Sequence, residues 1–251
     1  MPRPAPPWVL VDGYVDQDLG TLKTGKEAEI RIVERRALDG TGRHLLAEKR
    51  YRPKTVSRKG ELEELGFAKA ATFRNDIRYR EDRAIRNSRD RRAVAKMTRR
   101  GREVVRQDWV GHEFDVLRAL WDAAAPVPYP VSTDRDCAVL LEYLGDDDGA
   151  APRLAQARLG AAALRSAWEQ LGEALRAVVG AGWVHADLSA HNLLWWADRL
   201  WLIDLPQAVD LHRSTQGYEL LHRDVVNVCR WFASKGLRDA DDPDALFASL
   251  V

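Results

Sequence analysis

The sequence predicts an α+β protein with two lobes, a small β-rich lobe at the N-terminus and a mainly helical lobe at the C-terminus. Strand-like runs dominate residues 22–51, and a continuous apolar run at 137–145 is typical of a buried strand. Beyond residue 160, apolar side chains recur at the spacing of amphipathic helices. We expect these regions: an arm at 1–18, an N-lobe at 19–144 with a long basic insert at about 52–108, and a minimal helical C-lobe at 145–251.

The first half of the chain contains a predicted hairpin. EIRIVERRAL and RHLLAEKRY flank the turn sequence DGTG, whose glycines tolerate the positive φ that a tight turn needs. Residues 1–8 form a loose, proline-rich arm in this interpretation. Residues 52–108 are rich in charge and lack a sustained apolar period, so we expect them to be partly helical and partly mobile.

Three helices and one further strand complete the expectation. An amphipathic helix begins near Trp109 and stops at AAAPVPYP, and a strand runs through RLWLIDL and ends in an aspartate. A helix that ends at Gly180 or Gly182 and another over about 218–233 form the C-lobe. Their apolar faces consist of Leu164, Trp168, Leu171, Leu175 and Val178 in the first and of Leu221, Val225, Val228 and Trp231 in the second.

Composition excludes several classes of protein. Acidic and basic residues nearly cancel to a net charge of +1, so the overall charge says little about partners. Cys137 and Cys229 are too few and too far apart to predict a disulfide framework. The proline-containing N-terminus lacks the apolar core of a signal peptide, and no apolar run has the length of a membrane span. We expect a cytoplasmic protein.

The stretch WVHADLSAHNLLWW, residues 183–196, places an acid and a carboxamide between apolar flanks that favour burial. Asp187 and Asn192 are five positions apart, and Asp204 follows in the next predicted strand. Such oxygen ligands suit Mg²⁺, and an aspartate that binds no metal can accept a proton from a hydroxyl. Taken alone, Asp187 and Asn192 could equally be a helix cap and a turn residue. We interpret His185 as a structural residue bonded to the backbone.

Phosphoryl transfer uses a base aspartate, an asparagine and a second aspartate on metal, and a lysine on the phosphates. Lys49, at the end of the second hairpin strand, is the candidate lysine. Glu113, on the helix near Trp109, is its candidate partner, because an ion pair would hold the flexible lysine head in place.

These motifs resemble the RIO family of atypical serine/threonine protein kinases, of the type-1-like kind and from a bacterial source. VHADLSAHNLLWW resembles the catalytic loop HxDLSxxN, and LWLIDLPQAVD resembles the metal-binding strand, with Gln207 in its IDxxQ pattern. HRDVVNVCRWF resembles the following helix with its R-D-x-x-N pattern. KTGKEAEI resembles the phosphate-loop sequence STGKEA, and GAAPRL the A-P-x-L after the hinge.

The resemblance implies a protein-kinase-like fold that spans about residues 19–235 and uses ATP with Mg²⁺, or with Mn²⁺ in its place. It assigns catalytic roles to Asp187, as general base, and to Asp204, as a metal ligand that can also accept phosphate. It implies that Asn192 is the other metal ligand. The nucleotide-binding residues that it implies are Gly25, Lys26, Lys49, Glu113, Glu142 and Leu144, the last two through backbone groups that meet the adenine.

The chain departs from these patterns at several positions. Ala186 replaces the arginine that precedes the catalytic aspartate of most protein kinases, so a phosphorylated activation loop would find no cation there. Pro206 replaces the usual small residue after the metal-binding strand. The segment between Lys49 and Glu113 is longer than the family pattern and strongly basic.

Three functions remain open at this stage. The first is a RIO-like ATP-dependent serine/threonine kinase or ATPase with an unknown protein substrate. The second is a small-molecule phosphotransferase of the aminoglycoside or choline kinase type, whose loop also reads HxDxxxxN. The third is a non-enzymatic nucleotide-binding switch on a ribosomal or other RNA particle. In this case the arginines of residues 74–106 would bind the RNA phosphates. For that segment the alternative is a solvated, charge-balanced helix pair, because acids are interleaved with the arginines.

Overall fold

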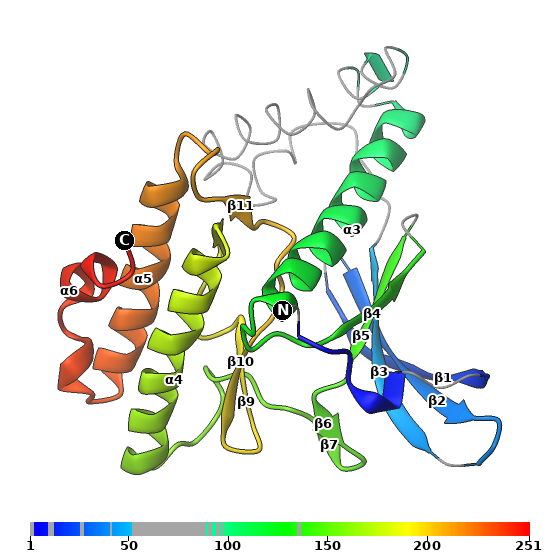
Figure 1. The fold of residues 1–251 in the computed structure, drawn as a ribbon, viewed down its shortest axis with the longest axis horizontal. Helices are drawn as coiled ribbons and strands as arrows, with labels where there is room; N and C mark the ends of the chain where they lie inside the picture. The colour runs from blue at the N-terminus through cyan, green and yellow to red at the C-terminus, as the bar shows by residue number, and fades with distance from the viewer. Residues whose placement is uncertain are drawn as a thin grey trace.

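The computed structural model describes residues 3–9, 13–25, 28–40, 42–51, 89, 92–93, 96, 98–134 and 137–251. Within them, an antiparallel sheet is followed by a helical lobe, as the sequence predicts (Figure 1). The arginine-rich stretch 74–106 lies largely outside the described residues, so its polyanion-binding role stays a prediction. No helix within the described ranges is both long enough and apolar enough to cross a membrane.

The sheet has the strand order β1-β2-β3-β5-β4, and every neighbouring pair is antiparallel. The turn after β2 contains Gly40 with φ +76°, the positive angle predicted for this hairpin. The bounds are β1 Tyr14–Thr24, β2 Ala28–Ala37, β3 Arg43–Tyr51, β4 Pro130–Thr133 and β5 Ala138–Glu142.

β1 begins at Tyr14, inside the range 1–18 that we expected to form an arm. Its side chains are almost all exposed, so no apolar alternation marks it as a strand in the sequence. The described part of the arm, residues 3–9, is packed rather than loose. The Arg3 guanidinium lies 3.7 Å from the centre of the Trp121 ring, and the Trp8 ring stacks on His44 with centroids 5.5 Å apart, beside the short 3₁₀ helix η1 Pro7–Val9.

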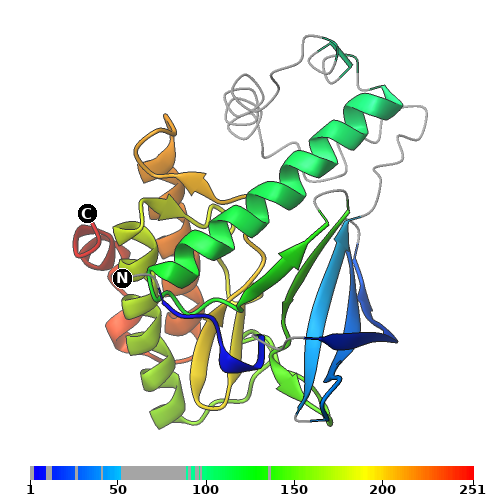
Figure 2. The same ribbon diagram turned by 45° about the vertical axis from the view of Figure 1, so that its right-hand side comes forward.

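Helix α3, Arg99–Asp122, runs between the sheet and the helical lobe in both views (Figures 1 and 2). It starts ten residues before Trp109, because the Thr98 side chain caps it by accepting a hydrogen bond from the Gly101 N–H at 3.1 Å. Trp109 and Val110 pack against the sheet, whereas Leu117 and its neighbours join the core of the helical lobe. α3 therefore belongs to both cores, and Glu113 lies between the two contact regions.

The C-lobe consists of helices with short strand pairs between them (Figure 2). The two predicted amphipathic helices are present as α4 Ala161–Gly180 and α5 Gly217–Ser234. The strand expected to run into Asp204 ends at Leu202, and Asp204 follows with φ +68°, which breaks the extended conformation. The remaining elements are β6 Gly145–Asp146, β7 Gly149–Ala150, β8 Trp183–Val184, β9 Leu193–Trp196, β10 Arg199–Leu202, β11 Val209–Asp210, η3 Arg238–Ala240 and α6 Pro243–Ala248. Both cysteines are free thiols.

Candidate active site

Lys49 lies where the sheet, α3 and the segment after β10 meet. Its Nζ is 2.6 Å from Oε1 of Glu113 and 2.6 Å from Oδ1 of Asp204. The side chains of Lys49 and Glu113 are 10% and 1% exposed. The pair expected between Lys49 and Glu113 is therefore formed inside the protein, and it is joined to the acid of the expected metal site.

Lys49 and Asp204 stabilise each other's charged forms. Burial alone would lower the pKa of Lys49, but the carboxylates of Glu113 and Asp204 outweigh it and hold that pKa well above its usual value. The lysine charge in turn lowers the pKa of Asp204, against the opposing effect of burial. Lysine and aspartate are therefore both charged at neutral pH, and a phosphate that binds Lys49 would exchange one anionic partner for another.

Glu113 has two further donors that the sequence did not indicate. The Tyr51 hydroxyl donates to Oε2, and the Leu205 N–H donates to Oε1 at 3.3 Å. Tyr51 follows Lys49 by two positions in β3, so the two side chains project from the same face of the sheet. That spacing places Tyr51 beside Lys49, but only the fold shows that both side chains reach Glu113.

The opposite half of the site is the loop between β8 and β9. Asn192 Nδ2 donates to the backbone oxygen of Asp187 at 2.8 Å and to Asp187 Oδ2 at 3.3 Å. Asp187 and Asp204 are exposed, whereas Asn192 and both neighbours of Asp187 are buried. The Asp187 side chain is therefore open to solvent, while the residues on both sides of it are packed in the interior.

Helix α5 holds this loop through two consecutive residues. Asp224 is 1% exposed and accepts the N–H groups of Ala186, at 2.7 Å, and Leu188, at 3.1 Å. The Arg223 guanidinium donates to the Ala186 carbonyl. Ala186 has φ +64°, a conformation that L-residues adopt at a cost, so these bonds keep a strained residue directly before Asp187.

His185 has the structural role expected from the sequence. Its ring Nε2 lies 3.0 Å from the carbonyl oxygen of Ile203, and the histidine is 3% exposed. The Ile203 N–H donates to the Asn192 carbonyl at 3.0 Å. The loop that carries Asp187 is therefore tied to the segment that carries Asp204.

The electrostatics of the two acids differ in direction. Partial desolvation by the packed protein around it raises the pKa of Asp187, and the nearby charge of Asp204 adds to this, against an opposing effect of His185. Lys49 lowers the pKa of Asp204. A carboxylate with a raised pKa is the better proton acceptor, whereas one with a lowered pKa stays ionised, which suits a metal ligand.

The oxygen atoms near Asp204 fit a hard cation such as Mg²⁺. The Asn192 amide nitrogen is used by Asp187, which leaves its Oδ1 for coordination, and Asp204 bonds to Lys49 through Oδ1, which leaves Oδ2. The described residues contain no cluster of three or more His, Cys, Asp or Glu that could hold a metal on its own. An ion here would complete its shell with water and phosphate oxygens, as Mg²⁺ commonly does.

The backbone at the end of β5 connects the two lobes. The Glu142 N–H donates to the Tyr129 carbonyl at 2.9 Å, and the Leu144 carbonyl accepts the Ala151 N–H at 2.8 Å. The backbone at Glu142 and Leu144 thus lies at the connection between the lobes, where an adenine is expected to bind. The Glu142 side chain turns back to accept the Tyr129 N–H at 3.0 Å.

The predicted phosphate loop is described only in part. The Gly25 N–H donates to the Ala28 carbonyl at 2.8 Å, which closes the turn between β1 and β2. A Cβ at Gly25 would lie 3.1 Å from that carbonyl oxygen, so a larger residue would crowd the turn. Lys26 lies outside the described residues.

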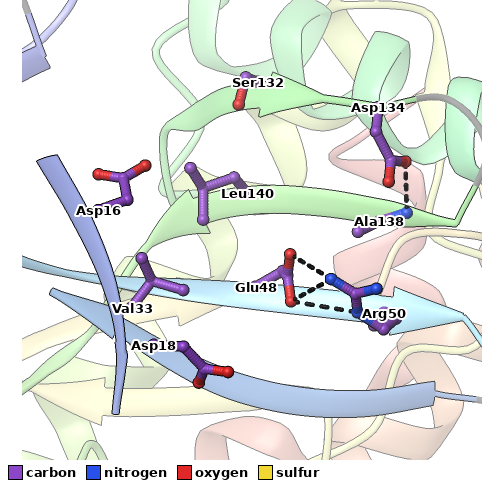
Figure 3. Close-up of a pocket in the computed structure, with 9 residues that line it drawn as sticks. All are labelled: Asp16, Asp18, Val33, Glu48, Arg50, Ser132, Asp134, Ala138 and Leu140. Atoms are coloured by element: carbon purple, nitrogen blue, oxygen red, sulfur yellow. Dashed lines mark hydrogen bonds and ion pairs between the residues drawn. The ribbon is translucent and has the colours of Figure 1, made fainter. Parts of the chain in front are cut away.

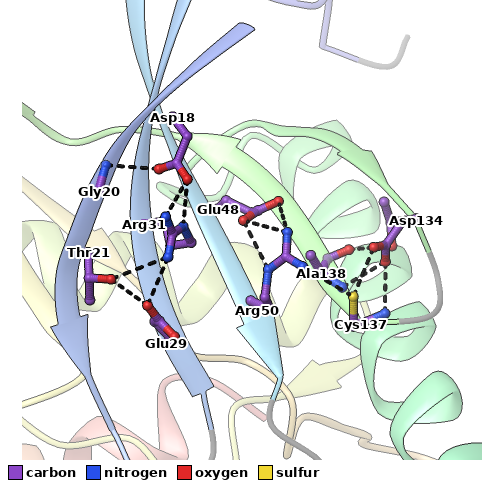
Figure 4. Close-up of polar contacts among 11 residues, drawn as sticks. Asp18, Gly20, Thr21, Glu29, Arg31, Glu48, Arg50, Asp134, Cys137 and Ala138 are labelled. Carbon is purple, nitrogen blue, oxygen red and sulfur yellow. Dashed lines mark hydrogen bonds and ion pairs between the residues drawn. The ribbon is translucent and has the colours of Figure 1, made fainter.

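A pocket of about 260 Å³ lies on one face of the sheet (Figure 3). Glu48 and Arg50 line it, and because they flank Lys49 in β3 they project from the opposite side. The charges in this region pair with near neighbours, for example Arg50 Nη2 with Glu48 Oε1 at 2.9 Å (Figure 4). The pocket is therefore separate from the site around Lys49.

An antiparallel sheet followed by a helical lobe, with a lysine and two acids meeting between them, defines a protein-kinase-like fold. The RIO domain matches residues 68–245, and the chain belongs to the RIO family. It is 33% identical over 238 residues to the RIO-type serine/threonine-protein kinase Rio1 of Haloferax volcanii, covering 94% of this chain and 69% of that protein. It is 33% identical over 138 residues to Rio1 of Thermoplasma acidophilum, which covers 55% of this chain and 69% of the relative.

The chain is also 32% identical over 147 residues to human serine/threonine-protein kinase RIO3. That match covers 58% of this chain but only 28% of RIO3. The chain thus spans little more than a quarter of the RIO3 protein. The matched relatives are serine/threonine kinases, and a kinase of this family uses ATP.

Proposed function

We propose that the chain is a RIO-type serine/threonine protein kinase or ATPase that transfers the γ-phosphoryl group of ATP in a Mg²⁺-dependent reaction. The observation that carries the proposal is the contact of Lys49 with both Glu113 and Asp204, each at 2.6 Å. A buried lysine fixed by one acid and shared with a second is suited to bind a polyphosphate beside a cation.

Each half of the site has its own task in this proposal. Lys49 binds the α and β phosphates, and Glu113 fixes its direction. Asp187 accepts the proton of the substrate hydroxyl while the hydroxyl oxygen forms a bond to the γ phosphorus. The bond between the γ phosphorus and the β–γ bridging oxygen breaks at the same time, which releases ADP. Asn192 and Asp204 would hold the ion, and Mg²⁺, when bound, neutralises phosphate charge.

Asp204 can also serve as an acceptor. Its charged carboxylate lies beside Lys49, so attack of a carboxylate oxygen on the γ phosphorus would give an aspartyl phosphate and ADP, and water would then release phosphate. This route gives ATPase activity without a protein substrate. An acyl phosphate on Asp204 would be labile to hydroxylamine, whereas a phosphoserine or phosphothreonine would not.

Titration calorimetry tests the proposal directly. ATP should bind much more tightly in Mg²⁺ than in EDTA, with Mn²⁺ replacing Mg²⁺ at least in part. Radiolabelled γ-phosphate should appear in inorganic phosphate or on a protein acceptor. Equal affinity in Mg²⁺ and EDTA, together with no release or transfer of label, would refute the proposed function.

A further inference from the structure

We propose that Tyr51 is a positioning residue for the phosphate-binding lysine, acting through Glu113. Its hydroxyl donates to Oε2 of Glu113, while Lys49 takes Oε1. The inference rests on the proposed function, because it concerns how Lys49 is aimed at a nucleotide. No motif in the sequence marks Tyr51.

The ring and the hydroxyl of Tyr51 have different environments. Tyr51 as a whole is 4% exposed, and it packs with Trp109, Val110 and Val139 in the small core between the sheet and α3. Phenylalanine would fill this core equally well. The hydroxyl is therefore the part that packing does not explain, and a buried hydroxyl is costly unless it is paired.

The hydrogen bond fixes the orientation of the carboxylate. A carboxylate held only by Lys49 could rotate about its last bond and carry the lysine head with it. The Leu205 N–H and Lys49 both bind Oε1, whereas Tyr51 is the donor on Oε2. Together these donors fix both oxygens and hence the direction in which Nζ points.

The protonation state of Tyr51 suits this task. Burial raises its pKa well above the usual value, and the negative charge of Glu113 raises it further. The phenol therefore remains a donor throughout the pH range in which the protein would work. Tyr51 is also the last residue of β3, so it ties the end of that strand to the middle of α3.

The test compares Tyr51→Phe with Tyr129→Phe, which removes an equally buried hydroxyl elsewhere. Both tyrosines are 4% exposed, and the Tyr129 hydroxyl accepts a hydrogen bond from Arg118 at 2.7 Å. Affinities are measured for Mg·ATP and for adenosine, which lacks phosphates. Because Tyr51→Phe removes a hydrogen bond to the charged Glu113, and part of that effect reaches Lys49, we expect it to weaken Mg·ATP binding about tenfold. Adenosine affinity should stay unchanged, and Tyr129→Phe should alter neither.

A double-mutant cycle with Glu113→Gln shows whether the effect passes through Glu113. Tyr51→Phe should add little to the loss already caused by Glu113→Gln. Equal behaviour of Tyr51→Phe and Tyr129→Phe, an equal loss of adenosine binding, or full additivity with Glu113→Gln would each overturn the inference. If wild type binds Mg·ATP and Glu113→Gln weakens that binding, such a result leaves the proposed function intact. Absence of Mg²⁺-dependent binding in wild type would overturn both.

Discussion

Lys49 and Asp187 approach the site from opposite lobes, and different kinds of bond hold them. Lys49 depends on side chains 64 and 155 positions away along the chain, those of Glu113 and Asp204. Asp187 depends on its own loop, through Asn192, and on backbone N–H groups of that loop that Asp224 accepts. The N-lobe half can therefore change when α3 moves relative to the sheet, whereas the C-lobe half is held within one lobe.

The pKa shifts of the two aspartates also differ between the N-lobe half and the C-lobe half of the site. The lysine on the N-lobe side stabilises the charged form of Asp204, and the packed loop on the C-lobe side disfavours the charged form of Asp187. Two aspartates close together are thereby made chemically unequal. In the proposed mechanism, this inequality would let Asp204 bind the ion while Asp187 accepts the proton.

The largest expected effect is on chemistry and comes from the C-lobe half. Asp187→Asn keeps the shape of the side chain but removes the proton acceptor, so phosphoryl transfer to a hydroxyl should fall by roughly 10²–10⁴. Mg·ATP affinity should stay near the wild-type value. Rates under saturating Mg·ATP measure the effect, and Asp198→Asn, in the turn between β9 and β10, is the control. A variant that keeps its rate would remove Asp187 from the proposed mechanism.

A smaller effect is expected from the residue beneath that loop. Asp224→Asn leaves a single acceptor oxygen for two buried N–H groups and places an amide beside them. We expect it to lower the free energy of unfolding by about 1–3 kcal/mol, with a lower transfer rate as the loop loosens. Urea unfolding measures the first. The control is Asp244→Asn. The Asp244 side chain is 84% exposed, so this change should have almost no effect on stability. Similar losses in both variants would show that burial of Asp224 is not what matters.

The smallest effect concerns pH and the N-lobe half. Because the folded pKa of Asp204 lies below its unfolded value, this group stabilises the fold above the unfolded pKa, and that contribution disappears as pH falls through the folded pKa. Asp204→Asn should therefore lose less stability than wild type between neutral and acidic pH. Urea unfolding in EDTA, followed by tryptophan fluorescence at several pH values, gives the two slopes. Parallel slopes would mean that Lys49 does not hold Asp204 in solution.

How far the sequence could predict the fold depends on the element. The hairpin of β2 and β3 was predictable because its turn contains Asp39-Gly40, and α4 and α5 because their apolar faces are regular. β1 was missed since its side chains are exposed on both faces. Residues 52–108 were expected to be partly helical, but the first turns of α3 were not assigned to this helix, because they are highly charged and their start depends on the capping side chain of Thr98.

How much of the site the sequence could predict depends on how far apart its residues lie along the chain. Asp187 and Asn192 lie in one short stretch, so their proximity could be predicted, and the order of motifs then pointed to Lys49 and Asp204. The contacts of Tyr51 and Asp224 could not be predicted, because each joins elements that only the folded chain brings together. The positive φ of Asp204 is likewise a property of the packed segment after β10.

We propose that ATP binds on the Lys49 face of the sheet, between the lobes, and two neighbouring residues of β3 offer the sharpest test. Lys49→Met removes the cation that points toward Glu113, and Arg50→Met removes the next cation, which points to the opposite face. The measurement is the Mg·ATP dissociation constant of both variants by calorimetry, with thermal unfolding as the check on folding. A hydrogen-bonded charge is worth about 1.5–3 kcal/mol, so Lys49→Met should weaken binding about 10- to 150-fold. Arg50→Met should leave the dissociation constant nearly unchanged. Equal losses in both variants, or a loss with Arg50→Met alone, would show that ATP does not bind on the Lys49 face.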